Sequence, residues 1–192
     1  RSRSARSAMS SAEAGTGAGA GAGGGTHRLL DHFFRREHGR LVAGLTRRLG
    51  AGGLDLAEEA VQEAMTRAVR RWPIAGVPDD PAAWLATTAY RCAIDVLRRA
   101  ARDGDRLPGL GPATVAAAEG WRDGSPFGAD DDTLQLLFMC SHPALTRLSR
   151  VALTLKAVGG LGVDEIAAAL RATPTAVQQR LVRAKRRLAA PD

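Results

Sequence analysis

Apolar residues recur with a helical period along most of this chain. The clearest case is Asp55–Trp72, whose apolar side chains stand three or four residues apart. We expect Pro73 to end this helix, because proline lacks the backbone N–H that a helix interior uses. Alternating runs of β-branched residues, which indicate strands, are missing. The pattern therefore predicts an all-α fold.

Further helices are expected on both sides of this one. Asp80 as N-cap and Pro81 as first residue begin a helix that runs to about Arg102. The expected helices are roughly His27–Leu49, Asp55–Trp72, Pro81–Arg102, Asp132–Ser141, Thr146–Val158, Val163–Leu170 and Pro174–Leu188.

Small and helix-breaking residues divide the chain into two helical segments. Residues 1–26 contain 7 Gly, 7 Ala and 5 Ser, which predicts a disordered tail. Residues 103–129 are rich in Gly and Pro and predict a linker, with at most a short helical turn at Ala113–Glu119. We expect two small helical domains, 27–102 and 130–192, joined by this flexible linker.

The net charge of +7 is unevenly distributed: +4 in residues 27–102, −5 in 103–133 and +6 in 134–192. Two basic segments favour a polyanionic partner such as nucleic acid, although a solvated basic surface has the same composition. No run of about 18 apolar residues is present, which excludes a membrane span from the sequence. Two cysteines cannot frame a disulfide scaffold, so we expect the reducing cytoplasm.

The C-terminal segment has the form of a helix-turn-helix. Val163–Leu170, a three-residue turn and Pro174–Leu188 place their apolar stripes toward each other. The second helix carries five basic residues and no acidic one, as a helix that reads base edges and phosphates requires. A structural hairpin with a basic solvated face is the alternative. The side chains expected to face DNA are Thr175, Gln178, Gln179, Arg180, Arg183, Lys185, Arg186 and Arg187.

The first segment carries a second pattern. The polar side of its central helix displays Asp55, Glu58, Glu59, Gln62 and Glu63. Acidic residues at the start of a helix also suit the helix dipole, which is a sufficient structural explanation by itself. Beyond a rigid loop, the next helix places basic residues beside aromatic ones, which suits the binding of unpaired bases and backbone phosphates. For Trp84 a place in the core is the alternative.

At these residues the chain resembles the extracytoplasmic-function sigma factors of bacterial RNA polymerase. Asp55–Ala64 is similar to the helix with which that family docks on the polymerase clamp. Gly76–Leu85 and Ala93–Arg99 resemble the loop and helix that melt and read the downstream promoter element. Asp164–Ala167 and Val177–Leu188 resemble the reader of the upstream element.

The resemblance implies a transcription initiation factor with no catalytic residue, no cofactor and no metal. Its partners would be core RNA polymerase and promoter DNA, both duplex and melted, with an anti-sigma factor or regulatory extension left open. Polymerase binding would fall to Asp55, Glu58, Glu59, Gln62 and Glu63. The downstream element would be held by Ile74, Pro78, Asp80, Trp84, Tyr90, Arg91, Arg98, Arg99 and Arg102.

Asp131–Leu145 and Gln179–Lys185 resemble one subgroup, which usually carries a C-terminal tetratricopeptide-like extension. The chain stops at Asp192, so we expect that extension to be missing or cut away. Two departures from the family concern the downstream element: Tyr90 stands where Arg is common, and Asp80 where Asn is common.

Three other functions compete with this interpretation. A stand-alone helix-turn-helix regulator of duplex DNA explains the C-terminal segment but not the acidic helix. An enzyme is disfavoured because no ordered set of His, Cys and nucleophilic Ser accompanies the acidic residues, and Cys140 with His142 cannot fill a zinc site. The third competing function is that of a pure interaction module, such as an adaptor.

Overall fold

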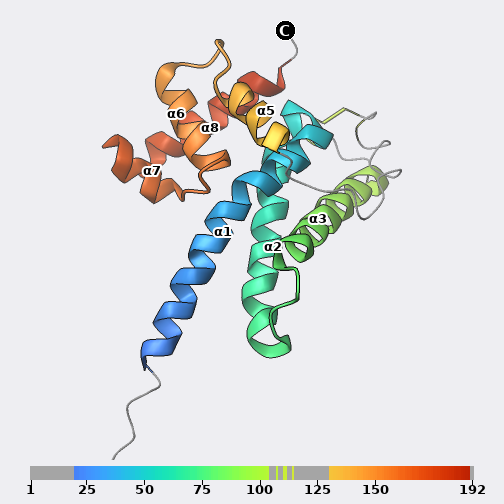
Figure 1. The fold of residues 1–192 in the computed structure, drawn as a ribbon. Coiled ribbons are helices and arrows are strands. Elements are labelled where there is room, and N and C mark those ends of the chain that lie inside the picture. The colour runs from blue at the N-terminus through green and yellow to red at the C-terminus, as the bar shows by residue number, and fades with distance from the viewer. Residues whose placement is uncertain (1–19, 104–106, 108–109, 112–113, 115–129, 191–192) are drawn as a thin grey trace, which may run out of the picture. The chain divides into compact units, whose positions relative to one another are not determined.

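The computed structural model describes residues 20–103, 107, 110–111, 114 and 130–190, and of residues 20–32 and 130 the backbone alone. Every regular element in these residues is helical, which confirms the all-α prediction (Figure 1). In chain order the elements are α1 (Ala20–Leu49), a short 3-10 helix η1 (Ala51–Gly53), α2 (Leu54–Ala75), α3 (Pro81–Asp103), α5 (Asp130–Cys140), α6 (Arg147–Ala157), α7 (Val163–Leu170) and α8 (Pro174–Ala189).

Contacts divide the chain into two units, Arg1–His32 and Phe33–Asp192. α1 begins at Ala20, so the predicted start at His27 was too late. Glycine in a helix carries only a modest free-energy penalty per residue, so a Gly- and Ala-rich composition does not by itself prevent a helix. Of the predicted tail, residues 1–26, the last seven belong to α1 and residues 1–19 lie outside the described residues.

α2 and α3 pack against each other and hold the core of the first helical segment (Figure 1). Four of the ten buried residues of α2 are alanines, whose small side chains let α3 approach closely. Larger side chains from α3 and from the second half of α1 fill the remaining space; Leu45, Leu85 and Leu97 are almost fully buried. The α2–α3 pair is the frame that positions the loop between them.

Pro73 does not end α2, contrary to the prediction. The helix continues to Ala75 with Pro73 inside it. A proline in the last turn removes one N–H donor from the helical hydrogen bonds. The turn can still form, because the helix ends soon afterwards. The end is instead made by Gly76, which adopts a left-handed φ of 84° and donates its N–H to the Trp72 carbonyl.

The predicted start of α3 is confirmed. Asp80 Oδ1 accepts a hydrogen bond from the Ala83 N–H at 2.9 Å, and Pro81 is the first residue of the helix. This capping satisfies a backbone donor that would otherwise be unpaired. It also fixes the direction in which the chain leaves the loop between α2 and α3.

The four C-terminal helices follow their predicted bounds within two residues. Thr146 caps α6, and its side chain accepts from the Ser149 N–H. Thr173 caps α8 in the same way, from the Ala176 N–H. The core between these helices is aliphatic, with Leu153, Ile166 and Val177 almost fully buried.

Both helical segments belong to the single unit Phe33–Asp192. α8 packs on η1, and Gly39 of α1 lies so close to the carbonyl oxygen of Val158 that a Cβ atom would not fit between them. The two helical segments are therefore in direct contact. The predicted linker, with its helical turn at Ala113–Glu119, lies for the most part outside the described residues.

Candidate nucleic-acid interface

α7, a tight turn and α8 form the helix-turn-helix that the sequence predicts. The turn is made by Arg171, which adopts a left-handed φ of 49°, and the Ala172 N–H donates to the Ala167 carbonyl at 2.9 Å. Ile166 and Val177 are fully buried where the two helices pack against each other. This packing leaves the opposite face of α8 available to a groove of DNA.

The outward face of α8 is polar and basic. Gln179, Arg183 and Arg186 are exposed, as the helical period predicts. Of the other predicted DNA-facing residues, Thr175, Gln178 and Arg187 are exposed and Arg180 is half-buried. Glutamine and arginine side chains of this kind can hydrogen-bond base edges and phosphates.

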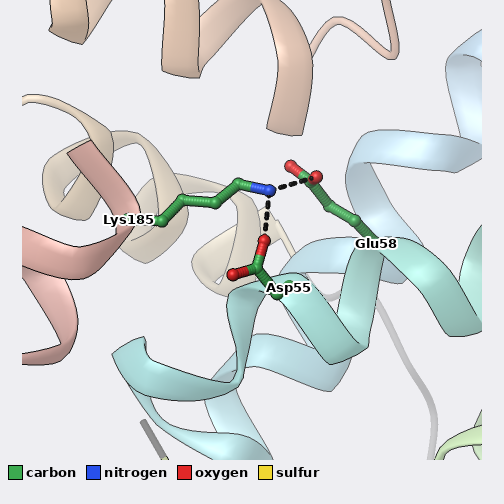
Figure 2. A network of polar contacts seen from close by, with 3 residues as sticks. All are labelled: Asp55, Glu58 and Lys185. Atoms are coloured by element: carbon green, nitrogen blue, oxygen red, sulfur yellow. Dashed lines mark hydrogen bonds and ion pairs between the residues drawn. The ribbon is translucent and has the colours of Figure 1, made fainter. Parts of the chain in front are cut away.

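Lys185 is the exception on this helix. Its Nζ lies 2.5 Å from Asp55 Oδ1 and 2.8 Å from Glu58 Oε2, so the side chain points to α2 (Figure 2). Burial by itself would lower the pKa of Lys185, but the two carboxylates outweigh burial and raise it above its ordinary value. In this structure Lys185 therefore binds α2, and its predicted place on the DNA-facing side needs correction.

The predicted acidic face of α2 is present with one correction. Asp55, Glu59, Gln62 and Glu63 are exposed. Glu58 is only 8% exposed, because Lys185 and the neighbouring helices cover it. A helical period places Glu58 next to Asp55 on the surface of α2. Glu58 is buried because α8, which lies far along the chain, packs over it.

The last turn of α2 and the loop between α2 and α3 present apolar side chains to solvent. Ile74 is 89% exposed and Val77 is also exposed, while Pro78 is half-buried. The Asp80 carboxylate is used as the cap of α3. That this segment receives an extruded base stays a prediction from the sequence.

Two aromatic residues predicted to contact DNA pack on other side chains; Trp84 is half-buried and Tyr90 is buried. The Trp84 ring meets the Trp72 ring edge-on at 5.6 Å, which favours the core alternative. Tyr90 is 6% exposed, with the Arg48 guanidinium over its ring at 5.9 Å. Tyr90 precedes Ala93 and Leu97 on the buried stripe of α3, so the helical period already carried this signal.

The basic residues predicted beside them do reach the surface. Arg91, Arg98, Arg99 and Arg102 of α3 are exposed. Arg98, Arg99 and Arg102 line one shallow groove together with Asp95. Such a groove fits a phosphate backbone better than a base.

Sequence reasoning missed the residues that join the two helical segments. Arg35 pairs with Glu165 at 2.6 Å, and Arg47 pairs with Asp132 at 2.6 Å. The second partner of each pair lies far along the chain, so no local period signals them. His38 is buried near Gly160, and burial, with a smaller contribution from Lys156, lowers the pKa of His38 to about 4.

The described part of the chain holds neither a cluster of metal-binding side chains nor a helix that could span a membrane. There, no group of three or more His, Cys, Asp or Glu side chains is arranged to hold a metal ion. Within the same residues no helix has the length and apolar character needed to cross a membrane.

Fold and surface together give an all-helical protein whose helix-turn-helix presents a polar, basic face. Residues 34–103 match sigma-70 region 2, and residues 135–188 match sigma-70 region 4. The chain belongs to the sigma-70 family, and the two regions support its place among the extracytoplasmic-function sigma factors. Sigma factors direct promoter recognition and the start of transcription, and these families are not enzymes. The match to region 2 favours this function over a stand-alone helix-turn-helix regulator.

An uncharacterized protein of Rhizobium meliloti (strain 1021) is 44% identical to this chain over 142 residues. The alignment covers 71% of this chain and 33% of that protein. The chain thus spans about a third of the length of this relative.

Proposed function

We propose that this chain binds core RNA polymerase through the acidic face of α2 and guides it to promoters whose upstream element α8 reads. The acidic face comprises Asp55, Glu58, Glu59, Gln62 and Glu63. A basic surface on polymerase is the complementary partner, because opposite charges steer association and fix its register.

The outward face of α8 is the observation that carries the proposal. Gln178, Gln179 and Arg183 are exposed on a helix whose other side is packed against α6 and α7. Base-reading residues need this combination, since the buried side holds the helix rigid while the exposed side enters the groove. Arg180, Arg186 and Arg187 then lie close enough on the same helix to hold phosphates.

The downstream element is assigned to α3 and the loop before it. We assign the last turn of α2 and the loop after it, from Ile74 through Pro78 to Asp80, to an extruded base, because Ile74 and Val77 expose apolar side chains there. Arg91, Arg98, Arg99 and Arg102 hold the adjoining backbone. Trp84 and Tyr90 support this surface from beneath, since both pack against other side chains.

The test is run-off transcription with purified core polymerase on a promoter library. We expect transcripts that start at a defined set of promoters only when the chain is present. A chain that binds duplex DNA but neither associates with core polymerase nor yields transcripts would be a stand-alone regulator. A chain that binds core polymerase without yielding transcripts would be an adaptor.

This function also implies where the chain acts and what it lacks. RNA polymerase and the chromosome of bacteria occupy the cytoplasm, so we assign the chain to that compartment. We assign it no enzymatic activity of its own, since every proposed site residue binds a macromolecule.

A further inference from the structure

Lys185 connects the two helical segments. Its side chain leaves α8 and ends between Asp55 and Glu58, in the first turns of α2 (Figure 2). The Lys185 side chain is 15% exposed and that of Glu58 is 10% exposed, whereas Asp55 borders the solvent. The cluster is therefore largely withdrawn from water on the side of Glu58.

The buried Lys185 ammonium and Glu58 carboxylate each need an opposite charge nearby. A buried carboxylate or ammonium without an opposite charge is strongly unfavourable, so separating the helices is possible only if both groups regain water or another partner. Glu58 Oε1 is already buried, and it has no hydrogen-bond partner within the described residues. The closed contact therefore leaves Glu58 with unused capacity to accept a hydrogen bond.

Other contacts hold the same two segments together. Arg35 of α1 pairs with Glu165 of α7, and Arg47 of α1 pairs with Asp132 of α5. At Gly39 the backbone of α1 meets the Val158 carbonyl so closely that no side chain would fit between them. The closed arrangement is thus specified at several separate points.

The closed contact occupies side chains to which the proposed function assigns other partners. Asp55 and Glu58 are assigned to polymerase, and Lys185 stands on the helix assigned to the upstream element. A carboxylate oxygen within 2.8 Å of Lys185 Nζ, under a packed helix, is not accessible to a basic group of another protein. Docking through Glu58 and the closed contact therefore exclude each other.

We propose that the chain inhibits itself: α8 covers the start of α2 through Lys185, and this contact must open before α2 docks on polymerase. The proposal rests on the function proposed above. A protein whose competent state is a minor fraction binds its partner with an apparent affinity reduced by that fraction. Changes that weaken the closed contact must therefore strengthen polymerase binding.

The first test is Lys185→Gln, which removes the charge and keeps a polar side chain one atom shorter than lysine. We expect the full chain with this change to bind core polymerase, without DNA, at least about threefold more tightly than the unchanged chain. Fluorescence anisotropy of a dye-labelled chain titrated with core polymerase measures the affinity. Arg147→Gln is the matched control, because Arg147 is exposed on α6 and its loss removes the same charge.

The second test opens the contact from a distance. Glu165→Gln weakens the ion pair with Arg35 while its amide oxygen still accepts from the Gly162 N–H, which caps α7. Glu165 belongs neither to the acidic face of α2 nor to the outward face of α8. Tighter polymerase binding by this variant therefore reports opening, and thermal melting of each variant confirms that it is folded.

The outcomes separate the two proposals. Tighter binding by Lys185→Gln, or by Glu165→Gln should the first variant fail to fold, supports self-inhibition. Equal or weaker binding by the folded variants, with the unchanged chain still binding, overturns self-inhibition and leaves the proposed function standing. Absence of binding by the unchanged chain and by every variant overturns both.

Discussion

Arg183 lies at the centre of the outward face of α8 and is exposed, so its guanidinium is placed to read a base edge. We predict that Arg183→Ala weakens binding to the preferred upstream element by about 1–3 kcal/mol and relaxes discrimination at one position. Competition binding on a promoter library measures this effect. Arg147→Ala removes a positive charge from α6, and an equal loss in that control would mean that Arg183 acts only through overall charge.

Glu63 occupies the exposed part of the acidic face, away from Lys185, and pairs with Arg67 on its own helix at 2.8 Å. We predict that Glu63→Ala lowers the affinity for core polymerase by about threefold to tenfold, mainly through a slower association rate. The matched control is Asp95→Ala, since Asp95 is an exposed acid on α3. Unchanged affinity for the Glu63 variant would remove this residue from the docking face.

His38 makes the free energy of unfolding of the protein depend on pH. Because burial holds the pKa of His38 at about 4, against 6.5 in the unfolded chain, the unfolded chain binds the extra proton first. We predict full stability above about pH 6.5 and a loss of up to about 3 kcal/mol as the pH falls to about 4. Urea unfolding across this range measures the loss, and His38→Gln should flatten it whereas His142→Gln should not.

The sequence predicted single residues well where their environment is local. The exposed residues of α8 follow from the helical period, and so does the buried Tyr90, which a consistent use of that period would have placed inside. Glu58 was not predictable in this way, because the lysine that covers it comes from 127 positions further along the chain. Local pattern determines a face, and tertiary contact determines which part of that face stays exposed.

Helix ends show the same division at the scale of elements. Caps are local chemistry, and the predicted caps Asp80 and Thr173 are both confirmed. Pro73 was overrated as a helix breaker, because the loss of one hydrogen bond in a last turn is tolerated when a left-handed glycine closes the helix. The end of α2 matters because it sets where the apolar loop to α3 begins.

Asp80 serves α3 as a cap while placing a negative charge beside the surface proposed to hold a melted strand. We predict that Asp80→Asn keeps the stability of the protein within a few tenths of a kcal/mol, because both side chains cap well, whereas Asp80→Ala lowers it by about 1 kcal/mol. Asp80→Asn should also bind a single-stranded promoter oligonucleotide more tightly, since a repulsion is removed. Weaker binding by this variant would indicate that the carboxylate itself contacts the DNA.

At the scale of the molecule, two helical segments were foreseen and their mutual contact was not. The helical period and the composition of the sequence carry information about each segment by itself, and none about how the two segments pack together. The contacts between them, such as Arg35 with Glu165, join positions 130 residues apart and depend on shape as much as on charge. This is why the sequence predicted two binding surfaces but not that one of them covers part of the other.

The chain contains two lysines, Lys156 and Lys185, which allows the closed contact to be followed chemically. Acylation by an amine reagent requires an accessible, uncharged amine, and Lys185 is both covered and held in its charged form by Asp55 and Glu58. Because about 1 M salt shortens the Debye length to about 3 Å, the exposed side of this contact should weaken there. We predict that the labelling rate of Lys185 relative to Lys156, measured by peptide mass spectrometry, rises at least about threefold in 1 M salt and in Asp55→Asn. Asp164→Asn, an exposed acid on α7, should leave the ratio unchanged, and a ratio indifferent to both salt and Asp55 would mean that the ion pairs do not hold α8 on α2.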